Sequence, residues 1–182
     1  METLKIYQKQ SVFRSKSVSC WYVIYTKPHH EKEVYKRLEE KGISAYLPLY
    51  TTIRHWSDRK KKIKVPLFSC YVFVFVNNIE YYKVLNTDGV IRYVAFEGKA
   101  VPIPEKQIQM VRNLLDSNAE VEEIQDKLYS GARVEIKAGP LIGISGQLVD
   151  FSGRKRVIIR LDEINKSMVV TLPLNLLKLV EQ

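Results

Sequence analysis

The chain has 182 residues, of which 46% are hydrophobic, and it carries a formal net charge of +9. This length fits one domain of ordinary size or two small ones, and the apolar content is sufficient for a folded core. No stretch approaches the roughly 20 apolar residues of a membrane-spanning helix, and residues 1–19 lack the apolar segment of a signal peptide. We therefore expect a cytoplasmic protein that has no membrane partner.

The positive charge is distributed unevenly along the chain. Residues 53–66 contain six bases and only one acid, whereas residues 116–126 contain five acids and no base. Residues 127–182 contain nine bases and five acids. Two positively charged parts are thus separated by an acidic stretch, a pattern that favours a polyanionic partner. The alternative is a basic protein whose charge serves only solubility.

The first part of the chain alternates between predicted strands and helices. In order, the pattern predicts a strand, a helix ended by a left-handed Gly42, an extended segment and a long hairpin arm, at residues 21–25, 29–41, 43–50 and 51–64. The tip of the arm is expected at residues 56–59. The arm leads directly into the longest apolar run of the sequence.

This run, residues 65–76, is rich in β-branched and aromatic residues, which favours a strand. Pleat geometry places Tyr71, Phe73 and Phe75 on one face and Val72, Val74 and Val76, with Cys70, on the other. Both faces are apolar and must be covered. We therefore expect this strand in the middle of a sheet.

Two further helices and one strand complete the first predicted domain. Asn77 or Asn78 is placed to cap a helix over residues 79–86, and a strand follows at 90–96. A third helix begins at Pro104-Glu105 and keeps helical spacing through its apolar residues, Ile108, Val111, Leu114 and Leu115. This order predicts an α+β domain over residues 20–115, an antiparallel sheet flanked by helices, preceded by an N-terminal extension at 1–19.

The rest of the chain changes in character. Residues 116–126 are acidic and short of large apolar residues, and we interpret them as a linker that is partly helical or irregular. From residue 127 onward the pattern is all β, with five short strands expected at residues 133–136, 146–149, 157–161, 169–172 and 177–180. Five strands in so short a segment favour a small closed barrel.

The second domain resembles a KOW motif, which is found in SH3-like barrels. The resemblance rests on residues 131–146, whose loop residues are Gly139, Pro140, Gly143 and Gly146. Glycine in this loop permits positive φ and close packing. The motif is moderately specific, because ribosomal proteins also carry it.

The first domain is similar to the N-terminal domain of the NusG family. The similarity rests on Trp21-Tyr22-Val23, on residues 66–74, and on Asp88-Gly89-Val90 followed by Phe96. Together the two resemblances cover the chain from Cys20 to Val180 in the family's order. The N-terminal extension and the divergence resemble the specialised paralogues RfaH, LoaP and UpxY, the last being antiterminators of capsular polysaccharide operons.

The resemblance implies that the protein binds RNA polymerase at the clamp helices of the largest subunit. The matching positions are Tyr25, Phe68, Tyr71, Phe73 and Phe96. A purely structural role is an equal alternative for any one of them, although Phe68 is expected at the exposed start of its strand. Ser69-Cys70 departs from the family's Pro-Gly or Pro-Asn. Residues 80–83 depart from the threonine-rich motif that contacts the polymerase gate loop in RfaH.

The resemblance also implies contact with non-template DNA or nascent RNA. The matching and neighbouring residues near the first helix are Lys27, Lys32, Lys36 and Arg37. The hairpin bases are expected to touch upstream DNA: Arg54, Arg59, Lys60, Lys61 and Lys62, with Trp56 among them. Lysine and arginine bind phosphate without reading sequence, and Trp56 is suited to stacking on a base. A solvated hairpin tip is the alternative for the lysine run. The KOW domain is expected to recruit a small-subunit ribosomal protein or a termination factor.

The leading hypothesis is a monomeric transcription antitermination factor that suppresses pausing or termination at operons such as surface polysaccharide clusters. The alternative is a KOW-containing RNA-binding or ribosome-associated protein. We predict no enzyme, no cofactor, no metal and no catalytic residues, because the histidines and carboxylates lack a catalytic or metal-like arrangement. Cys20 and Cys70 are expected to be buried free thiols.

Overall fold

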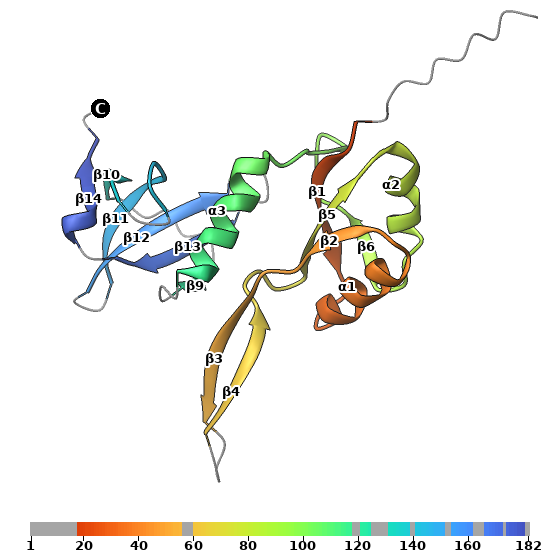
Figure 1. Ribbon diagram of the computed structural model, residues 1–182, viewed down its shortest axis with the longest axis horizontal. Coiled ribbons are helices and arrows are strands. Elements are labelled where there is room, and N and C mark those ends of the chain that lie inside the picture. The colour runs from red at the N-terminus through yellow and green to blue at the C-terminus, as the bar shows by residue number, and fades with distance from the viewer. Residues whose placement is uncertain are drawn as a thin grey trace, which may run out of the picture.

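Figure 1 shows the computed structural model of the chain. It describes residues 18–55, 60–117, 121–124, 131–138, 141–151, 154–161, 166–172 and 174–180. The predicted hairpin tip at 56–59 and Gly139-Pro140 of the predicted KOW loop lie outside these residues.

The first domain is built on a four-stranded antiparallel sheet in the order β2-β5-β1-β6. These strands are β1 Cys20–Thr26, β2 Ser44–Tyr46, β5 Tyr71–Val76 and β6 Val90–Tyr93. The strand β5 lies inside the sheet, as its two apolar faces predict. Its Val72, Val74 and Val76 share a buried core with Val34 of α1 (Glu31–Glu40) and Val84 of α2 (Asn78–Leu85).

Helix α1 ends, and helix α2 begins, at the residues that the sequence indicates. Gly42 has a φ of 70°, so it follows α1 in the left-handed conformation that glycine adopts without steric cost. Asn77 caps α2: its side chain accepts hydrogen bonds from the backbone N–H of Ile79 at 2.9 Å and of Glu80 at 3.1 Å. The Glu80 carboxylate in return accepts from the Asn77 N–H at 3.1 Å, which completes a capping box.

The opposite face of the sheet packs against α3 (Glu105–Asp116). Ile108, Val111 and Leu114 recur at helical spacing and are fully buried. They belong to one core with Trp21 and Phe73 of the sheet. This core continues without a break into the second domain, where its members include Val134, Ile136 and Met168.

The predicted strand over residues 65–76 is wrong as a single element. The chain forms β4 (Lys60–Pro66) and β5, with a turn at residues 67–70 between them. Cys70 has a φ of 67°, which is incompatible with a continuous strand. The strand β4 pairs with β3 (Leu49–His55) as a two-stranded ribbon that projects from the body of the molecule (Figure 1).

The predicted strand over residues 90–96 is likewise divided. Residues after β6 form β7 (Ala95–Phe96), which pairs with β8 (Lys99–Ala100) in a small hairpin. Glu97 and Gly98 turn this hairpin, with φ values of 48° and 79°.

The C-terminal sheet has six antiparallel strands in the order β14-β10-β11-β12-β13-β9. Five of them confirm the predicted strands: β10 Ala132–Ile136, β11 Ser145–Phe151, β12 Arg154–Leu161, β13 Lys166–Thr171 and β14 Leu177–Leu179. A short 3-10 helix, Leu174–Leu176, precedes the last strand. Closure of this sheet into a barrel stays a prediction, because β14 and β9 stand at the two ends of its strand order.

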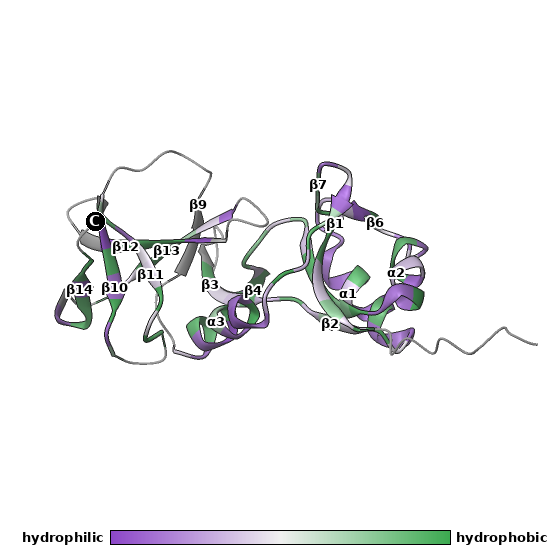
Figure 2. Cartoon of the chain, turned by 90° about the horizontal axis from the view of Figure 1, so that it is seen from above, coloured by the Kyte–Doolittle hydropathy of each residue, from purple (hydrophilic) through white to green (hydrophobic). Residues whose placement is uncertain are grey.

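The sixth strand, β9 (Val121–Ile124), comes from the acidic stretch that was expected to be an irregular or helical linker. Val121 pairs with Val170, and Ile124 pairs with Ser167. The segment has apolar residues only at its two ends, so its sequence does not indicate a strand. It becomes a strand by pairing with β13, which lies far along the sequence. In Figure 2 the helix α3 lies between the two sheets. None of the described helices has the length and apolar character needed to cross a bilayer.

Candidate interaction surfaces

An aromatic group lies on the face of the first sheet that carries α3. Tyr25 of β1 is the register partner of Tyr71 of β5, and their rings are 5.4 Å apart in an edge-to-face arrangement. Phe68 and Phe73 make a similar contact with ring centroids 6.1 Å apart. The structure therefore brings four of the five predicted polymerase-binding residues together. The fifth, Phe96, is 72% exposed on the separate β7–β8 hairpin.

The expected exposure of Phe68 is wrong, because its side chain is 0% exposed. After β4 the backbone N–H of Leu67 donates to the carbonyl of Pro48 at 2.8 Å, and the chain then turns at Cys70. This turn directs Phe68 into the core beside Phe73, which is also buried. Tyr25 and Tyr71 remain half-exposed. They are the members of the aromatic group that a partner can reach without unfolding the core.

The C-terminal sheet also contacts this group. The Lys166 ammonium of β13 lies 5.1 Å from the centroid of the Tyr71 ring, a cation–π contact. The neighbouring Cys70 side chain raises the pKa of Tyr25, while the Lys166 charge acts in the opposite direction. Lys166 therefore acts on both half-exposed tyrosines. Sequence reasoning missed it because Lys166 belongs to β13 of the C-terminal sheet, far from Tyr71 in the sequence.

Polar contacts attach α3 to the first sheet. The indole N–H of Trp21 donates to the Glu105 carboxylate, and the N–H of Ile103 donates to the Trp21 carbonyl at 2.8 Å. The Arg112 guanidinium lies 5.6 Å from the Trp21 ring centroid and 5.0 Å from that of Tyr46. No short motif in the sequence identifies these contacts, since each joins α3 to a distant strand.

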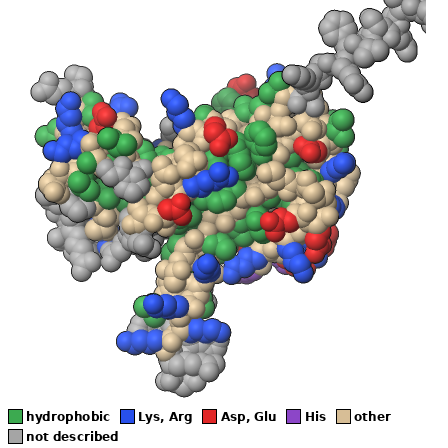
Figure 3. Space-filling view, in the orientation of Figure 1, with side chains coloured by type: hydrophobic (Ala, Val, Ile, Leu, Met, Phe, Trp, Pro, Cys, Tyr) green, Lys and Arg blue, Asp and Glu red, His purple; other side chains and the backbone are tan. Residues whose placement is uncertain are grey.

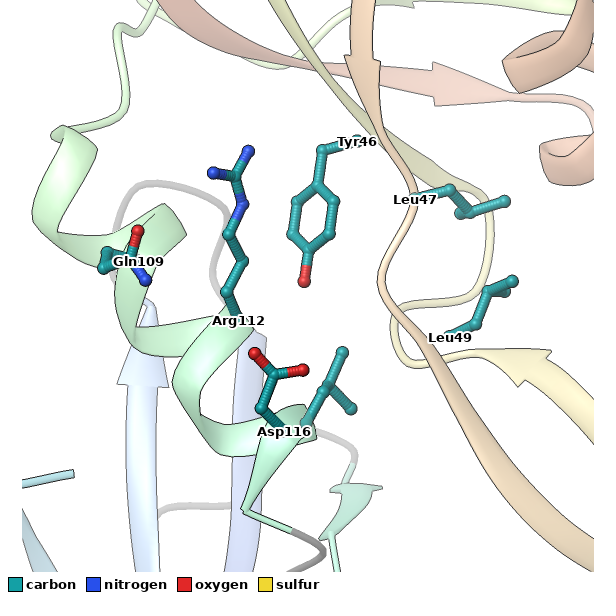
Figure 4. Close-up of a pocket in the computed structure, with 7 residues that line it drawn as sticks. Tyr46, Leu47, Leu49, Gln109, Arg112 and Asp116 are labelled. Carbon is teal, nitrogen blue, oxygen red and sulfur yellow. The ribbon is translucent and has the colours of Figure 1, made fainter. Parts of the chain in front are cut away.

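An open groove of about 470 Å³ lies beside this attachment, between α3 and the segment that joins β2 to β3. Figure 4 shows Arg112 extending from α3 toward the ring of Tyr46, with Leu47 and Leu49 across the groove. Burial raises the pKa of Tyr46 to about 12, although the Arg112 charge opposes this shift.

The predicted nucleic-acid residues near α1 are partly neutralised within the chain. Asp88 pairs with Lys27 at 3.6 Å and with the Arg37 guanidinium at 3.0 Å. These two cations lower the pKa of Asp88, with Arg37 having the larger effect. Arg37 also pairs with Glu33 at 2.6 Å, while Lys36 lies 3.7 Å from Glu40.

The turn at Asp88-Gly89 requires glycine at position 89. Its φ is 93°, and a Cβ at this position would lie 2.6 Å from a methyl group of Val34. The carbonyl of Gly89 accepts a hydrogen bond from the N–H of Lys27 at 2.9 Å. The turn thus fixes the start of α1, where Lys27 and Lys32 are exposed.

The remaining predicted nucleic-acid residues belong to the β3–β4 ribbon. Lys60, Lys61 and Lys62 are exposed. Trp56 and Arg59 lie outside the described residues, and the Arg54 side chain is likewise not described although its backbone belongs to β3. Figure 3 shows basic side chains along this ribbon and along the adjoining edge of the first domain. At the base of the ribbon, the Lys32 ammonium donates to the Lys64 carbonyl at 2.5 Å.

Of the glycines predicted for a KOW loop, Gly143 and Gly146 are described, and Gly146 belongs to β11 rather than to a loop. Gly143 has a φ of 81°. A Cβ at Gly146 would lie 2.5 Å from the carbonyl oxygen of Ile158 and 2.6 Å from a Val157 methyl group. Glycine at 146 therefore permits the close approach of β11 and β12.

Comparisons with known proteins identify the family. None of the curated proteins matches the chain. The chain is similar to the solved structure described as "Domain interaction in Thermotoga maritima NusG", with 22% identity, a TM-score of 0.56, and coverage of 90% of this chain and 98% of that chain. This likeness shows the fold.

The crystal structures of the MjSpt4:Spt5 complex in conformations B and A match with 18% and 15% identity and TM-scores of 0.29 and 0.30. They cover 89% of this chain and 97% and 99% of those chains. The model of the family described as "Transcription termination factor nusG" matches residues 19–112, which is more than half of the chain. The chain belongs to the NusG family.

Proposed function

We propose that this NusG-family transcription elongation factor binds RNA polymerase through the aromatic group and suppresses pausing or termination. The observation that carries the proposal is the grouping of Tyr25, Phe68, Tyr71 and Phe73 on one face of the sheet. Aromatic residues that are partly desolvated are typical anchors of protein interfaces. The docking partner is the pair of clamp helices of the polymerase's largest subunit. The protein acts without catalysis, as a monomer in the cytoplasm.

In the free protein, the C-terminal sheet covers the aromatic group, and we call this arrangement the closed form. Phe68 and Phe73 lie in the core that α3 shares with the C-terminal sheet, and Lys166 lies over Tyr71. A polymerase helix that contacts Tyr25 and Tyr71 therefore competes with the C-terminal sheet for the same face. Binding shifts the population toward a form in which this sheet has moved away.

The C-terminal sheet supplies a second contact in this proposal. After its release, the KOW domain recruits a small-subunit ribosomal protein, a termination factor or an RNA element. The specialised role is antitermination at particular operons, such as surface polysaccharide clusters, as in RfaH, LoaP and UpxY. Contact with non-template DNA or nascent RNA at the ribbon and at the start of α1 completes the complex.

The first experiment measures binding of the full chain to core RNA polymerase from the same organism. Tyr71→Ala should weaken binding by about tenfold, because loss of an aromatic interface anchor typically costs 1–2 kcal/mol. Ile142→Ala is the control, since Ile142 is 66% exposed in the C-terminal part of the chain and lies outside the aromatic group. Equal binding by the wild type and both variants would assign the aromatic group to the fold alone.

The second arm measures transcription through the protein's own upstream leader, with and without the protein. Read-through at pause or termination sites should rise with the wild type and not with Tyr71→Ala. Retention of structured RNA or ribosomal RNA without retention of polymerase would instead favour an RNA-binding or ribosome-associated protein. Increased termination would reverse the direction of the proposed effect.

A further inference from the structure

The strand β9 belongs to the C-terminal sheet, although in the sequence it comes shortly after the last helix of the first domain. Its four residues, 121–124, pair antiparallel with residues 167–170 of β13. Among the described strands it stands at one end of the sheet order, with β13 as its neighbour. The segment that the sequence predicts as a linker between the domains is therefore partly a strand of the second one.

The helix before β9 is fixed to the first domain. Leu114 of α3 is fully buried in the shared core. Ser117 ends the helix: its hydroxyl donates to the Leu114 carbonyl at 2.7 Å, and its N–H donates to the Asn113 carbonyl at 3.0 Å. Val121, the first residue of β9, follows Ser117 after three residues. The connection from α3 to the C-terminal sheet is thus very short while β9 stays paired.

The length of this connection limits how far the C-terminal sheet can move from the first sheet. With β9 paired, the four residues 117–120 span at most about 14 Å when fully extended. With β9 unpaired, the connection consists of the fifteen residues before β10, 117–131, which span up to about 50 Å. One helix with its side chains is about 10–12 Å across, so a pair of helices needs more room than the short connection allows.

Strand β13 carries both contacts that hold the closed form at this point. Its first residue, Lys166, lies 5.1 Å from the centroid of the Tyr71 ring. The next residue, Ser167, is the register partner of Ile124 at the end of β9. Pairing of β9 therefore holds β13 next to the aromatic group. A movement that takes Lys166 far from Tyr71 also pulls on β9.

The charges around β9 suit a contact that forms in the free protein and can be released. Residues 116–126, which include β9, contain five acids and no base. The five other strands of the C-terminal sheet contain seven bases and two acids. An acidic segment thus pairs with a basic sheet, and this attraction weakens as salt rises. A four-residue strand at the end of a sheet is also among the elements that open most readily.

We propose that β9 is a releasable strand that controls the separation of the two domains. While β9 is paired with β13, the C-terminal sheet stays beside Tyr25 and Tyr71. Once β9 unpairs, the longer connection lets the sheet move away and leaves room for a pair of helices on these tyrosines. This step deepens the opening described for the closed form and rests on the proposed function, because polymerase is the partner that gains access.

A disulfide between β9 and β13 tests this step. Ile124 and Ser167 are register partners, and opposite residues of an antiparallel pair have Cα atoms about 4.5–5.5 Å apart, a distance that a disulfide bridges. In the full chain with Ile124→Cys and Ser167→Cys, oxidation should weaken binding to core polymerase by about tenfold or more, because the open form is no longer populated. Reduction should restore binding. Wild type oxidised in parallel accounts for Cys20 and Cys70.

The matched control places the disulfide on the other side of β13. Ser167 is also the register partner of Arg160 on β12, so Arg160→Cys with Ser167→Cys fixes the same strand without holding β9. Oxidation of this variant should leave polymerase binding nearly unchanged. Equal weakening by the two disulfides would assign the effect to a stiffer β13. Full binding by the oxidised β9 variant would show that β9 stays with the sheet when the domains separate. Either result would overturn the proposal.

Hydrogen exchange of the free wild-type chain tests the release without polymerase. The backbone amides of β9 should exchange faster than those of β12, and the difference should grow as salt is raised. Protection of β9 equal to that of β12 at every salt concentration would contradict a releasable strand. Since this measurement contains no polymerase, its failure is distinct from a failure of the proposed function.

Discussion

Cys70 occupies a backbone conformation that its side chain disfavours. Its φ of 67° lies in the left-handed region, at the position where the resemblance to the family has glycine or asparagine. The Glu31 carboxylate, which is buried, accepts a hydrogen bond from the Cys70 N–H at 2.7 Å, and the Cys70 carbonyl accepts one from the Thr26 N–H at 2.8 Å. The surrounding structure thus imposes the turn on a residue that is poorly suited to it.

We predict that Cys70→Gly raises the free energy of unfolding by about 0.5–1 kcal/mol, because relief of backbone strain exceeds the added flexibility of the unfolded chain. Urea unfolding measures this change. Cys70→Ala is the control, since it removes the thiol and keeps the strained Cβ. A loss of stability in both variants would show that the thiol's contact with Tyr25 contributes more than the strain costs.

Phe68 shows where residue-level reasoning from the sequence fails. The resemblance places it in the polymerase-binding set, and its position at the start of an apolar run predicts exposure. Its burial follows from the turn at Cys70, whose positive φ no apolar pattern reveals. Alanine at this site creates a cavity and costs about 3–5 kcal/mol, so Tyr71 is the better probe of binding.

Among the helices and strands, α3 stabilises the first sheet through the contacts of its side chains. Arg112 lies between the rings of Trp21 and Tyr46, at 5.6 and 5.0 Å from their centroids. Arg112→Ala should lower the free energy of unfolding by about 1–2 kcal/mol, since two cation–π contacts and the packing of the aliphatic stem are lost. Urea unfolding followed by circular dichroism measures this loss.

The matched control for Arg112→Ala is Gln109→Ala, because Gln109 is on the same helix and lines the same groove. Gln109 is exposed and hydrogen-bonds only locally, to Asn113 at 2.8 Å, among the contacts of the described residues. Its replacement should change stability by less than about 0.5 kcal/mol. Equal losses in the two variants would mean that any truncation along this groove weakens the helix.

The elements that the sequence predicts well are those whose periodicity is local. The spacing of Ile108, Val111 and Leu114 predicts α3, and Asn77-Asn78 predicts the start of α2. The strand β9 was missed because Val121 and Ile124 form a strand only by pairing with β13, which follows them by many residues. Non-local pairing of a short segment has no signature within that segment.

In the whole molecule, the candidate site lies between the first sheet and the C-terminal sheet. The resemblance identifies the aromatic residues, and the sheet brings four of them together. The sequence could not show that α3 and the C-terminal sheet cover them, because such packing depends on the combined shapes of elements from both domains. The contacts of Trp21, Arg112 and Lys166 were missed for the same reason.

Lys166→Ala tests the proposed competition between the C-terminal sheet and polymerase. Loss of the cation–π contact with Tyr71 weakens the closed form by about 0.5–1 kcal/mol, so polymerase binding should tighten about two- to fivefold. Affinity measurements with core polymerase check this. Lys178→Ala, an exposed lysine on β14, is the control for charge and should not tighten binding. Weaker binding by Lys166→Ala alone would make Lys166 a direct polymerase contact.

The core that joins the two sheets through α3 also affects how the free protein behaves at high concentration. Phe68, Phe73 and the apolar side of α3 are internal while this core is intact, so they cannot form a contiguous apolar patch on the surface. Such patches promote self-association of soluble proteins. The intact core thus keeps this face from promiscuous contacts and protects the protein from aggregation.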